Sequence, residues 1–301
     1  MNIFTPIESH IILGYNCNHH CRHCVVQAKR SESENVDKNL SIEGARNAID
    51  IAISNGASKI VLSGGEPTVR SDLPELVSYC LSQGKDVQIQ TNGFNISMIK
   101  QVCEQNFSEI DRLEFMIPLH SADTDQNDFI CGCTGGLKNA VASLAYLESI
   151  HANVIGKVVL TRLTGDLKEL CRIYERYKAC RVIIAYPHCV SFSIERVREI
   201  DLNESETREI FQGFYKQPPG IPVLLQGFPR CFIGDISGVV IQEEQKDYIS
   251  LEIVEYKFQS RKGNSWHEYR KLDKRKFARC DVCCYNGNCE GIWKEYMQIF
   301  A

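Results

Sequence analysis

Short apolar runs alternate with amphipathic stretches over the first two thirds of the chain, and this alternation constrains the fold more than any other feature. The runs predict six strands, at about residues 11–13, 59–62, 87–90, 113–119, 154–160 and 181–186. Helices are expected between them, at about residues 42–54, 71–83, 96–104, 137–149 and 166–177. Strands that alternate with helices form right-handed βαβ units around a parallel sheet. Periodicity alone does not decide whether this sheet is open or curled.

A cysteine-rich loop follows the first predicted strand, with Cys17, Cys21 and Cys24 separated by three and then two residues. Thiolates are the ligands that iron–sulfur clusters select, and a loop this short can aim three of them at one metal assembly. Three protein ligands leave one metal position open, whereas structural zinc sites are almost always closed by four. The spacing favours a catalytic cluster, and a zinc knuckle completed by one of the loop's histidines is the alternative.

Composition places the protein in a broad class. The 301 residues can form one large α/β domain with a small appendage, and 44% hydrophobic with 24% charged residues is typical of globular proteins. A net charge of -4 gives no basic surface for nucleic acid. Neither a secretory signal nor a long apolar run is present, so we expect no membrane span. The 15 cysteines are unevenly placed, and the clustered ones then indicate metal binding or catalysis, not disulfides, in a reducing, cytoplasmic setting.

A second cysteine cluster lies near the end of the sequence, with Cys280, Cys283 and Cys289 in a Cys-x2-Cys-x5-Cys pattern. This spacing suits three ligands of one metal centre, and Cys231 can supply a fourth. Four closed thiolates also describe structural zinc, which stays open as an alternative. Cys284 is either a bystander or a competing ligand.

The last third of the chain is expected to form a separate unit. A helix at about residues 204–215 precedes a Pro-Pro-Gly break, which places a boundary between a domain of residues 1–217 and one of residues 218–301. Residues 239–242 and 248–254 alternate around a charged turn and predict a β-hairpin. A final helix is expected from Ile292.

Three more motifs come directly after predicted strands, where ligands bind in parallel α/β sheets. Gly64, Gly65 and Glu66 follow the second strand, and the glycines let backbone approach a ligand closely. Asn92 follows the third strand and Ser121 the fourth. Taken singly, each of these motifs also fits an ordinary turn or cap.

The cysteine loop, followed one βα unit later by Gly-Gly-Glu, resembles the radical S-adenosylmethionine (SAM) enzymes. That resemblance implies a partial (β/α)6 TIM-like barrel in which Cys17, Cys21 and Cys24 hold a [4Fe-4S] cluster whose fourth iron binds SAM. Just before the third cysteine the family usually has a large aromatic residue, whereas this chain has His23. The implied activity is reductive cleavage of SAM to a 5′-deoxyadenosyl radical, which abstracts a hydrogen atom from the substrate.

The same resemblance implies roles for the other motifs. Gly64, Gly65 and Glu66 would bind the methionyl amine of SAM, Asn92 would line its pocket, and Ser121 would contact its carboxylate or ribose. The C-terminal cysteines resemble those of the SPASM/twitch extension of these enzymes, in the shorter twitch form of a β-hairpin and a helix. We expect this extension to hold one auxiliary [4Fe-4S] cluster.

Two further cysteines are candidates for a catalytic role as hydrogen donors to a substrate radical. Cys133 lies in a Gly-rich segment after the fourth strand, and Cys189 lies past the sixth strand, near the barrel mouth. Such donation would give epimerisation, whereas an auxiliary cluster that accepts an electron would give oxidation or a cross-link. Each thiol can equally be a small, inert residue.

The substrate is expected to be a peptide, because many enzymes with this extension modify ribosomally made peptides. The first strand begins near residue 9, which leaves no room for an N-terminal recognition domain and favours a separate recognition protein. A small sugar, nucleoside or alcohol is the alternative substrate, and a non-enzymatic zinc-binding scaffold is the alternative outside enzymology. An electron donor such as flavodoxin or ferredoxin is implied.

Overall fold

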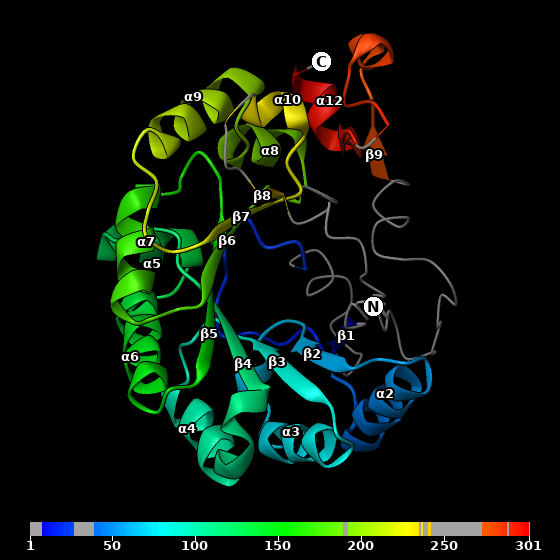
Figure 1. The fold of residues 1–301 in the computed structure, drawn as a ribbon, viewed down its shortest axis with the longest axis vertical. Coiled ribbons are helices and arrows are strands. Elements are labelled where there is room, and N and C mark those ends of the chain that lie inside the picture. Colours follow the sequence, from blue (N-terminus) through cyan, green and yellow to red (C-terminus); the bar gives the residue numbers. More distant parts are fainter. Residues whose placement is uncertain are drawn as a thin grey trace, which may run out of the picture.

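The computed structural model describes residues 8–26, 39–188, 192–234, 236, 240–241, 273–287 and 289–300. Its central feature is one sheet of eight parallel strands, each paired with the next along the chain. The strands are β1 (Glu8–Ile12), β2 (Lys59–Ser63), β3 (Asp86–Gln90), β4 (Leu113–Pro118), β5 (Asn153–Val159), β6 (Arg181–Ala185), β7 (Val223–Gln226) and β8 (Val240–Ile241). The sheet curls into an open arc, so the fold is a partial barrel (Figure 1).

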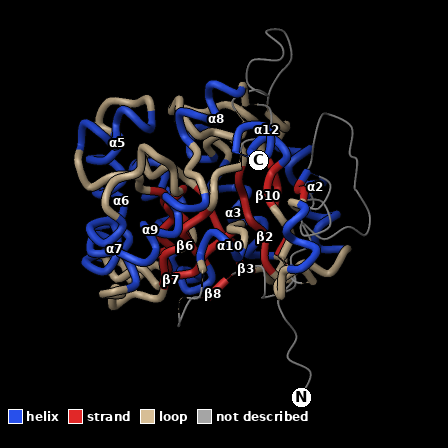
Figure 2. Tube along the Cα trace, turned by 90° about the horizontal axis from the view of Figure 1, so that it is seen from above, coloured by secondary structure: helices blue, strands red, loops and turns tan. Residues whose placement is uncertain are grey.

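Helices cover the outside of this arc (Figures 1 and 2). Those between successive strands are α2 (Ile42–Ser54), α3 (Leu73–Ser82), α4 (Ile96–Gln105), α5 (Thr124–Cys131), α6 (Gly136–Ser149) and α7 (Leu167–Arg176). They are followed by α8 (Ile194–Ile200), α9 (Glu204–Tyr215), α10 (Arg230–Ile233) and α12 (Lys294–Phe300). Short 3-10 turns occur at Pro67–Val69, Phe107–Arg112 and Ala278–Val282. None of the described helices is long and apolar enough to cross a membrane.

Strand β4 illustrates how the sequence pattern builds the two faces of the sheet. Leu113, Phe115 and Ile117 are fully buried in the core shared with the helices, while the residues between them are only partly buried. Because side chains alternate across a strand, one face packs against the helical layer and the other lines the inside of the arc. The side chains within the strands thus form the two faces of the sheet, and the segments that follow the strands are left to form a binding site.

Side-chain caps start several of the outer helices close to the strand ends. The Ser41 hydroxyl accepts a hydrogen bond from the Gly44 amide at 3.0 Å before α2. The Asn95 side chain accepts one from the Met98 amide at 3.2 Å before α4. Such caps satisfy amide groups that the first turn of a helix leaves unpaired.

The predicted fold class is confirmed: all six expected strands and all five helices between them are present within a residue or two of their expected ends, except that β1 begins three residues earlier. Two short strands, β7 and β8, extend the parallel sheet beyond the predicted six. Helices α5, α8 and α10 were not predicted, because each is short and lacks a long amphipathic pattern.

The C-terminal prediction is tested in two places. Val240–Ile241 forms a strand, as expected, and pairs in parallel with β7, whereas the other half of the predicted hairpin, 248–254, lies outside the described residues. The predicted final helix is present as α12 but begins two residues later than expected. Ile292–Trp293 is not helical but forms strand β10, which pairs antiparallel with β9 (Lys274–Arg275). Apolar alternation predicts a strand but not its partner.

The C-terminal segment packs directly onto the barrel. Tyr296 of α12 contacts the rings of Tyr186 and Phe232, with centroid distances of 6.4 and 5.4 Å. The indole of Trp293 stacks on His188 at 3.9 Å. The sheet itself also continues past residue 217 through β7 and β8. The division into domains of residues 1–217 and 218–301 stays a prediction.

Candidate active site

The Gly-Gly-Glu motif and the start of the cysteine loop are joined by backbone hydrogen bonds. The Gly65 amide donates to the Gly14 carbonyl at 2.8 Å, and the Glu66 amide donates to the Asn16 carbonyl at 2.8 Å. A Cβ added to Gly65 would lie 2.2 Å from the Asn16 carbonyl oxygen, and one added to Gly64 would lie 2.3 Å from that of Gly14. Only glycine permits this approach, so the two motifs form one continuous surface.

Glu66 is buried and holds the ends of two strands together. One carboxylate oxygen accepts hydrogen bonds from the amide and hydroxyl of Thr68, at 2.9 and 2.6 Å, and from the Thr91 hydroxyl at 2.6 Å. The other accepts from the Asn92 amide at 2.6 Å. The carboxylate thus links the segment after β2 to the end of β3, in addition to any contact it makes with a ligand.

Asn92 extends this network to the cysteine loop. Its side-chain amide donates to the Asn18 side-chain oxygen at 2.7 Å, and its own side-chain oxygen accepts from the Phe94 amide at 2.9 Å. Asn18 lies directly after the first cysteine of the loop. The structure therefore brings the residues predicted after β2 and β3 together with the cysteine loop.

The three cysteines of the loop are partly buried thiols, and the described cysteines contain no disulfide. The His19 amide donates to the Cys17 sulfur at 3.4 Å, and the Cys24 amide donates to the Cys21 carbonyl at 3.1 Å. Three reduced thiols in one short turn, with a backbone amide directed at a sulfur, suit the thiolate set of an iron–sulfur cluster. These residues would hold such a group, although their roles stay predictions.

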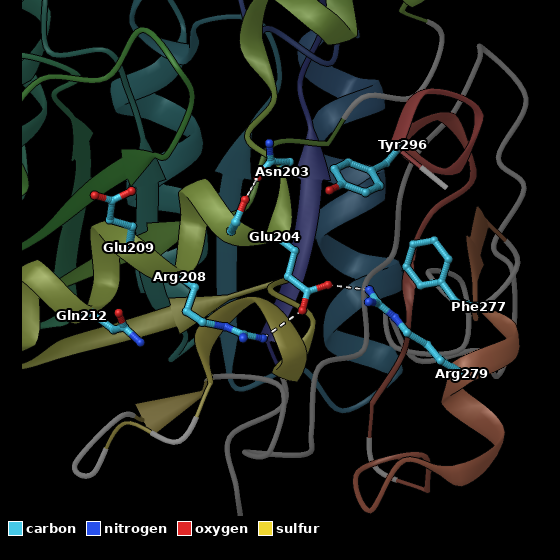
Figure 3. A pocket seen from close by; sticks show the side chains of 9 residues that line it. Asn203, Glu204, Arg208, Glu209, Gln212, Phe277, Arg279 and Tyr296 are labelled. Atoms are coloured by element: carbon cyan, nitrogen blue, oxygen red, sulfur yellow. Dashed lines mark hydrogen bonds and ion pairs between the residues drawn. The ribbon is translucent and has the colours of Figure 1, made fainter.

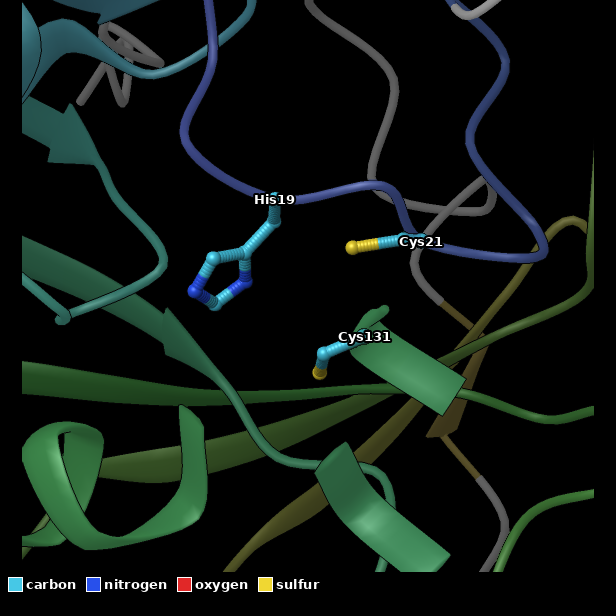
Figure 4. A group of neighbouring side chains, drawn as sticks. All are labelled: His19, Cys21 and Cys131. Atoms are coloured by element: carbon cyan, nitrogen blue, oxygen red, sulfur yellow. The ribbon is translucent and has the colours of Figure 1, made fainter. Parts of the chain in front are cut away.

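A tighter group of potential ligands also includes Cys21 (Figure 4). Within the described part of the chain, His19, Cys21 and Cys131 alone form a trio whose ligand atoms all lie within 4.8 Å of one another. Cys17 and Cys24 do not belong to it. A four-iron cluster binds its thiolates on separate irons, so its ligands need not crowd as those of a single ion do. Hydrogen bonding with Cys131, together with burial, raises the pKa of the Cys21 thiol.

Ser121 is buried and bonded within its own turn. Its hydroxyl donates to the Gln126 side-chain oxygen at 2.7 Å and accepts from the Asp123 amide at 3.0 Å. Both contacts are those of a local cap. The contact between Ser121 and SAM stays a prediction. Cys133 is partly buried near the loop, where burial and the nearby Asp128 raise its thiol pKa. Cys189 lies outside the described residues.

The C-terminal cysteines lie on short, loosely regular segments. Cys231 follows the first residue of α10, and burial raises its thiol pKa to about 11, with further contributions from Glu204 and then from Cys289 and Cys280. The Cys283 amide donates to the Cys280 carbonyl at 3.1 Å. Cys284 is exposed. These thiols are near enough to influence one another electrostatically, yet no three of the described ones meet as closely as the trio at Cys21.

A polar hollow of about 700 Å³ separates α9 from the C-terminal segment (Figure 3). It is lined by Asn203, Glu204, Ser205, Arg208, Glu209, Gln212, Phe277, Arg279 and Tyr296. Glu204 forms ion pairs with Arg208, at 2.8 Å, and with Arg279. No residue predicted to bind SAM or a cluster lines this hollow, so it lies apart from the candidate active site.

Several residues of the site were not predicted from the sequence. Thr68 and Thr91 bind the Glu66 carboxylate, Asn18 binds Asn92, and Asn127 with Cys131 packs beside the loop. A Glu-Pro-Thr sequence is a plausible cap signal for a short helical turn, and it could have indicated Thr68. The others depend on contacts between distant segments, which no local pattern reveals.

Residues 11–173, more than half of the chain, match the sequence profile of the Radical SAM superfamily. The chain belongs to this superfamily. Its members use a [4Fe-4S] cluster together with SAM, as the resemblance implied, and the matched span contains the cysteine loop, the Gly-Gly-Glu motif and α5.

Curated relatives match the barrel portion. Fe-coproporphyrin III synthase of Methanosarcina barkeri is 44% identical over 96 residues, which are 31% of this chain and 23% of that protein. Mycofactocin maturase MftC of Mycobacterium tuberculosis is 34% identical over 170 residues, which are 56% of this chain and 41% of that protein. The chain thus aligns with less than half the length of each of these relatives.

Solved structures of SuiB from Streptococcus suis have the same fold over most of the chain. SuiB bound to S-adenosylmethionine aligns with a TM-score of 0.68 at 15% identity, covering 97% of this chain and 74% of that one. SuiB bound to the precursor peptide SuiA aligns with a TM-score of 0.66, covering 97% and 73%. At this identity the likeness shows the fold alone.

Proposed function

We propose that this protein is a radical SAM enzyme whose cluster is held by Cys17, Cys21 and Cys24 and whose substrate is a peptide. The observation that carries the proposal is the set of hydrogen bonds that joins Gly65 and Glu66 to the backbone of the cysteine loop. When bound and reduced, the cluster supplies the electron that splits SAM into methionine and a 5′-deoxyadenosyl radical, which takes a hydrogen atom from the substrate.

The chain's own residues would position the cosubstrate. The backbone of Gly64 and Gly65 runs against the cysteine loop, so a methionyl amine bound there would lie beside the residues that would hold the cluster. Glu66 and Asn92 hold that surface to the end of β3. Ser121 would contact the carboxylate or ribose of SAM from the end of β4. Holding reactants in a fixed geometry is a large part of what such a site contributes to rate.

The C-terminal segment would hold one auxiliary [4Fe-4S] cluster through Cys231, Cys280, Cys283 and Cys289. Such a cluster would accept the electron left on a substrate radical, which leads to oxidation or a cross-link. Cys133 or Cys189 would instead donate a hydrogen atom if the outcome is epimerisation. In this scheme residues 1–217 form the radical SAM barrel and residues 218–301 the twitch-like extension.

A peptide substrate is supported by the names of two relatives, a maturase and a structure solved with a precursor peptide. A small-molecule substrate is the second candidate. It is favoured by the 44% identity to Fe-coproporphyrin III synthase, although that match covers only 96 residues. The proposal includes a cytoplasmic electron donor such as flavodoxin or ferredoxin, and a separate protein that presents the peptide.

The test begins with protein purified and reconstituted without oxygen. We expect a brown protein with about eight irons per chain, as two four-iron clusters require. Incubation with SAM, dithionite and short peptides encoded beside its gene should change the mass of one peptide. A mass change in a small metabolite alone would favour the second candidate. A colourless protein that binds two zinc ions and cleaves no SAM would overturn the proposal in favour of a zinc-binding scaffold.

A further inference from the structure

Cys131 ends helix α5 and lies against the cysteine loop, although no role as a cluster ligand was predicted for it. Its side chain is 6% exposed, and its sulfur lies within 4.8 Å of the Cys21 sulfur. Figure 4 shows the two thiols on facing segments, with the His19 ring beside them. A ligand of the catalytic cluster therefore has a second thiol as a direct neighbour.

Backbone hydrogen bonds fix this neighbourhood. The His20 amide donates to the Cys131 carbonyl at 3.0 Å, and the Arg22 amide donates to the Ile130 carbonyl at 2.9 Å. The two bonds lie on either side of Cys21, so its position relative to α5 does not depend on side-chain packing alone. The contact should accordingly persist when the loop holds a cluster.

The side-chain amide of Asn127 lies on one side of the Cys131 sulfur. The side-chain oxygen of Asn127 accepts from the backbone amides of His120 and Ser121, at 3.0 and 3.3 Å. These two donors fix the amide orientation, so its nitrogen faces Cys131 and donates to the sulfur at 3.7 Å. Asn127 is only 2% exposed, and water does not compete for this bond. The sulfur of Cys131 thus accepts a hydrogen bond on one side. Without a cluster the Cys21 thiol keeps its own proton and donates it toward Cys131, which is why its pKa is raised. A cluster ligand is a thiolate, so once Cys21 binds a cluster the only proton left between the two sulfurs is that of Cys131.

We infer that Cys131 donates a hydrogen bond to the Cys21 sulfur and thereby raises the reduction potential of the cluster. The inference rests on the proposed function, because it assigns Cys21 to that cluster. Hydrogen bonds to ligand sulfurs are among the features that set the potentials of iron–sulfur clusters. An added electron makes the thiolate a better acceptor, so the bond stabilises the reduced form more than the oxidised form. Cys131 is then a positioning residue that acts through Cys21.

A redox titration followed by electron paramagnetic resonance tests this role. Wild-type protein, Cys131→Ala and Cys131→Ser are reconstituted and poised at a series of potentials, with and without SAM. Only a cluster with an open iron position changes its spectrum when SAM coordinates, and this change separates the catalytic cluster from the auxiliary one. Cys80→Ala, which removes a buried thiol from helix α3, is the matched control.

In Cys131→Ala we expect wild-type iron content but a ratio of reduced to oxidised cluster about fivefold lower at a given potential. Cys131→Ser should lie close to wild type because a hydroxyl also donates, and Cys80→Ala should match wild type. An unchanged titration in Cys131→Ala would overturn the inference. Loss of iron from that variant would overturn it too, because Cys131 would then be a ligand. A wild-type protein without any SAM-responsive signal would overturn the proposed function, and this inference with it.

Discussion

The close approach of Gly65 to the cysteine loop predicts that Gly65→Ala weakens both the fold and the metal site. The new methyl group would lie 2.2 Å from the Asn16 carbonyl oxygen, far inside van der Waals contact. Relief requires that the loop move away, which breaks the hydrogen bonds from the Gly65 and Glu66 amides, both 2.8 Å long. Gly65 is a cleaner choice than Gly64, whose φ of 139° would add backbone strain to the steric effect.

The size of the effect follows from these contacts. The two backbone hydrogen bonds contribute about 1 kcal/mol each to stability, and overpacking typically costs about 1–3 kcal/mol. If the loop moves, the hydrogen bonds are lost but the steric overlap is relieved, so the two costs do not add in full. We therefore expect the free energy of unfolding to fall by about 3 kcal/mol. The matched control is Gly213→Ala in helix α9, where no atom lies within 4 Å of the added methyl group. That change should stabilise the protein by about 0.5–1 kcal/mol.

Urea unfolding of the metal-free protein, followed by circular dichroism, measures both variants. Iron bound after anaerobic reconstitution then shows whether the displaced loop still holds a cluster. We expect Gly65→Ala to have a lower midpoint and to lose the iron of one cluster, while Gly213→Ala keeps both. A Gly65→Ala protein that unfolds at the wild-type midpoint and keeps all its iron would refute the reasoning.

Three further predictions follow from other parts of the structure. Glu66→Gln places an amide nitrogen or a weaker acceptor among four hydrogen-bond donors, so urea unfolding should show a loss of about 1–3 kcal/mol and calorimetry a weaker affinity for SAM. Cys24→Ala should lower the iron content from about eight to about four per chain, whereas Cys180→Ala, which changes an exposed thiol, should leave it unchanged in the same iron assay. Burial and two nearby lysines lower the pKa of His10 to about 4, so the unfolded chain binds the proton first as the pH falls. Stability should therefore decline from about pH 6.5 to about pH 4, by at most about 3 kcal/mol, and a profile in His10→Gln that is as steep as wild type would contradict this.

Much of the barrel was predictable because local periodicity reports burial. Strand β4 alternates buried and partly buried residues, and helix α9 was predicted with both of its observed ends, Glu204 and Tyr215. Strands β7 and β8 are only four and two residues long, which is too short for a periodic signal to assign them to the sheet.

The site was predictable to the extent that its chemistry is local. The spacing of Cys17, Cys21 and Cys24 identified a metal-binding loop, and glycines after β2 indicated a close backbone approach. The sequence did not indicate that this approach is made to the cysteine loop itself. Helix α5 was missed because its eight residues carry few apolar side chains. The contact of Cys131 with the cysteine loop was missed for the same reason, because the two segments lie more than one hundred positions apart in the sequence.

The central claim is that the N-terminal cysteine loop holds the cluster that splits SAM. Its most direct test is the amount of 5′-deoxyadenosine formed by reconstituted protein given dithionite, SAM and its substrate, measured by liquid chromatography and mass spectrometry. Wild type should form the nucleoside, and Cys17→Ala should form none while still binding the iron of the auxiliary cluster. Absence of 5′-deoxyadenosine in wild type, or equal amounts in Cys17→Ala, would contradict the claim.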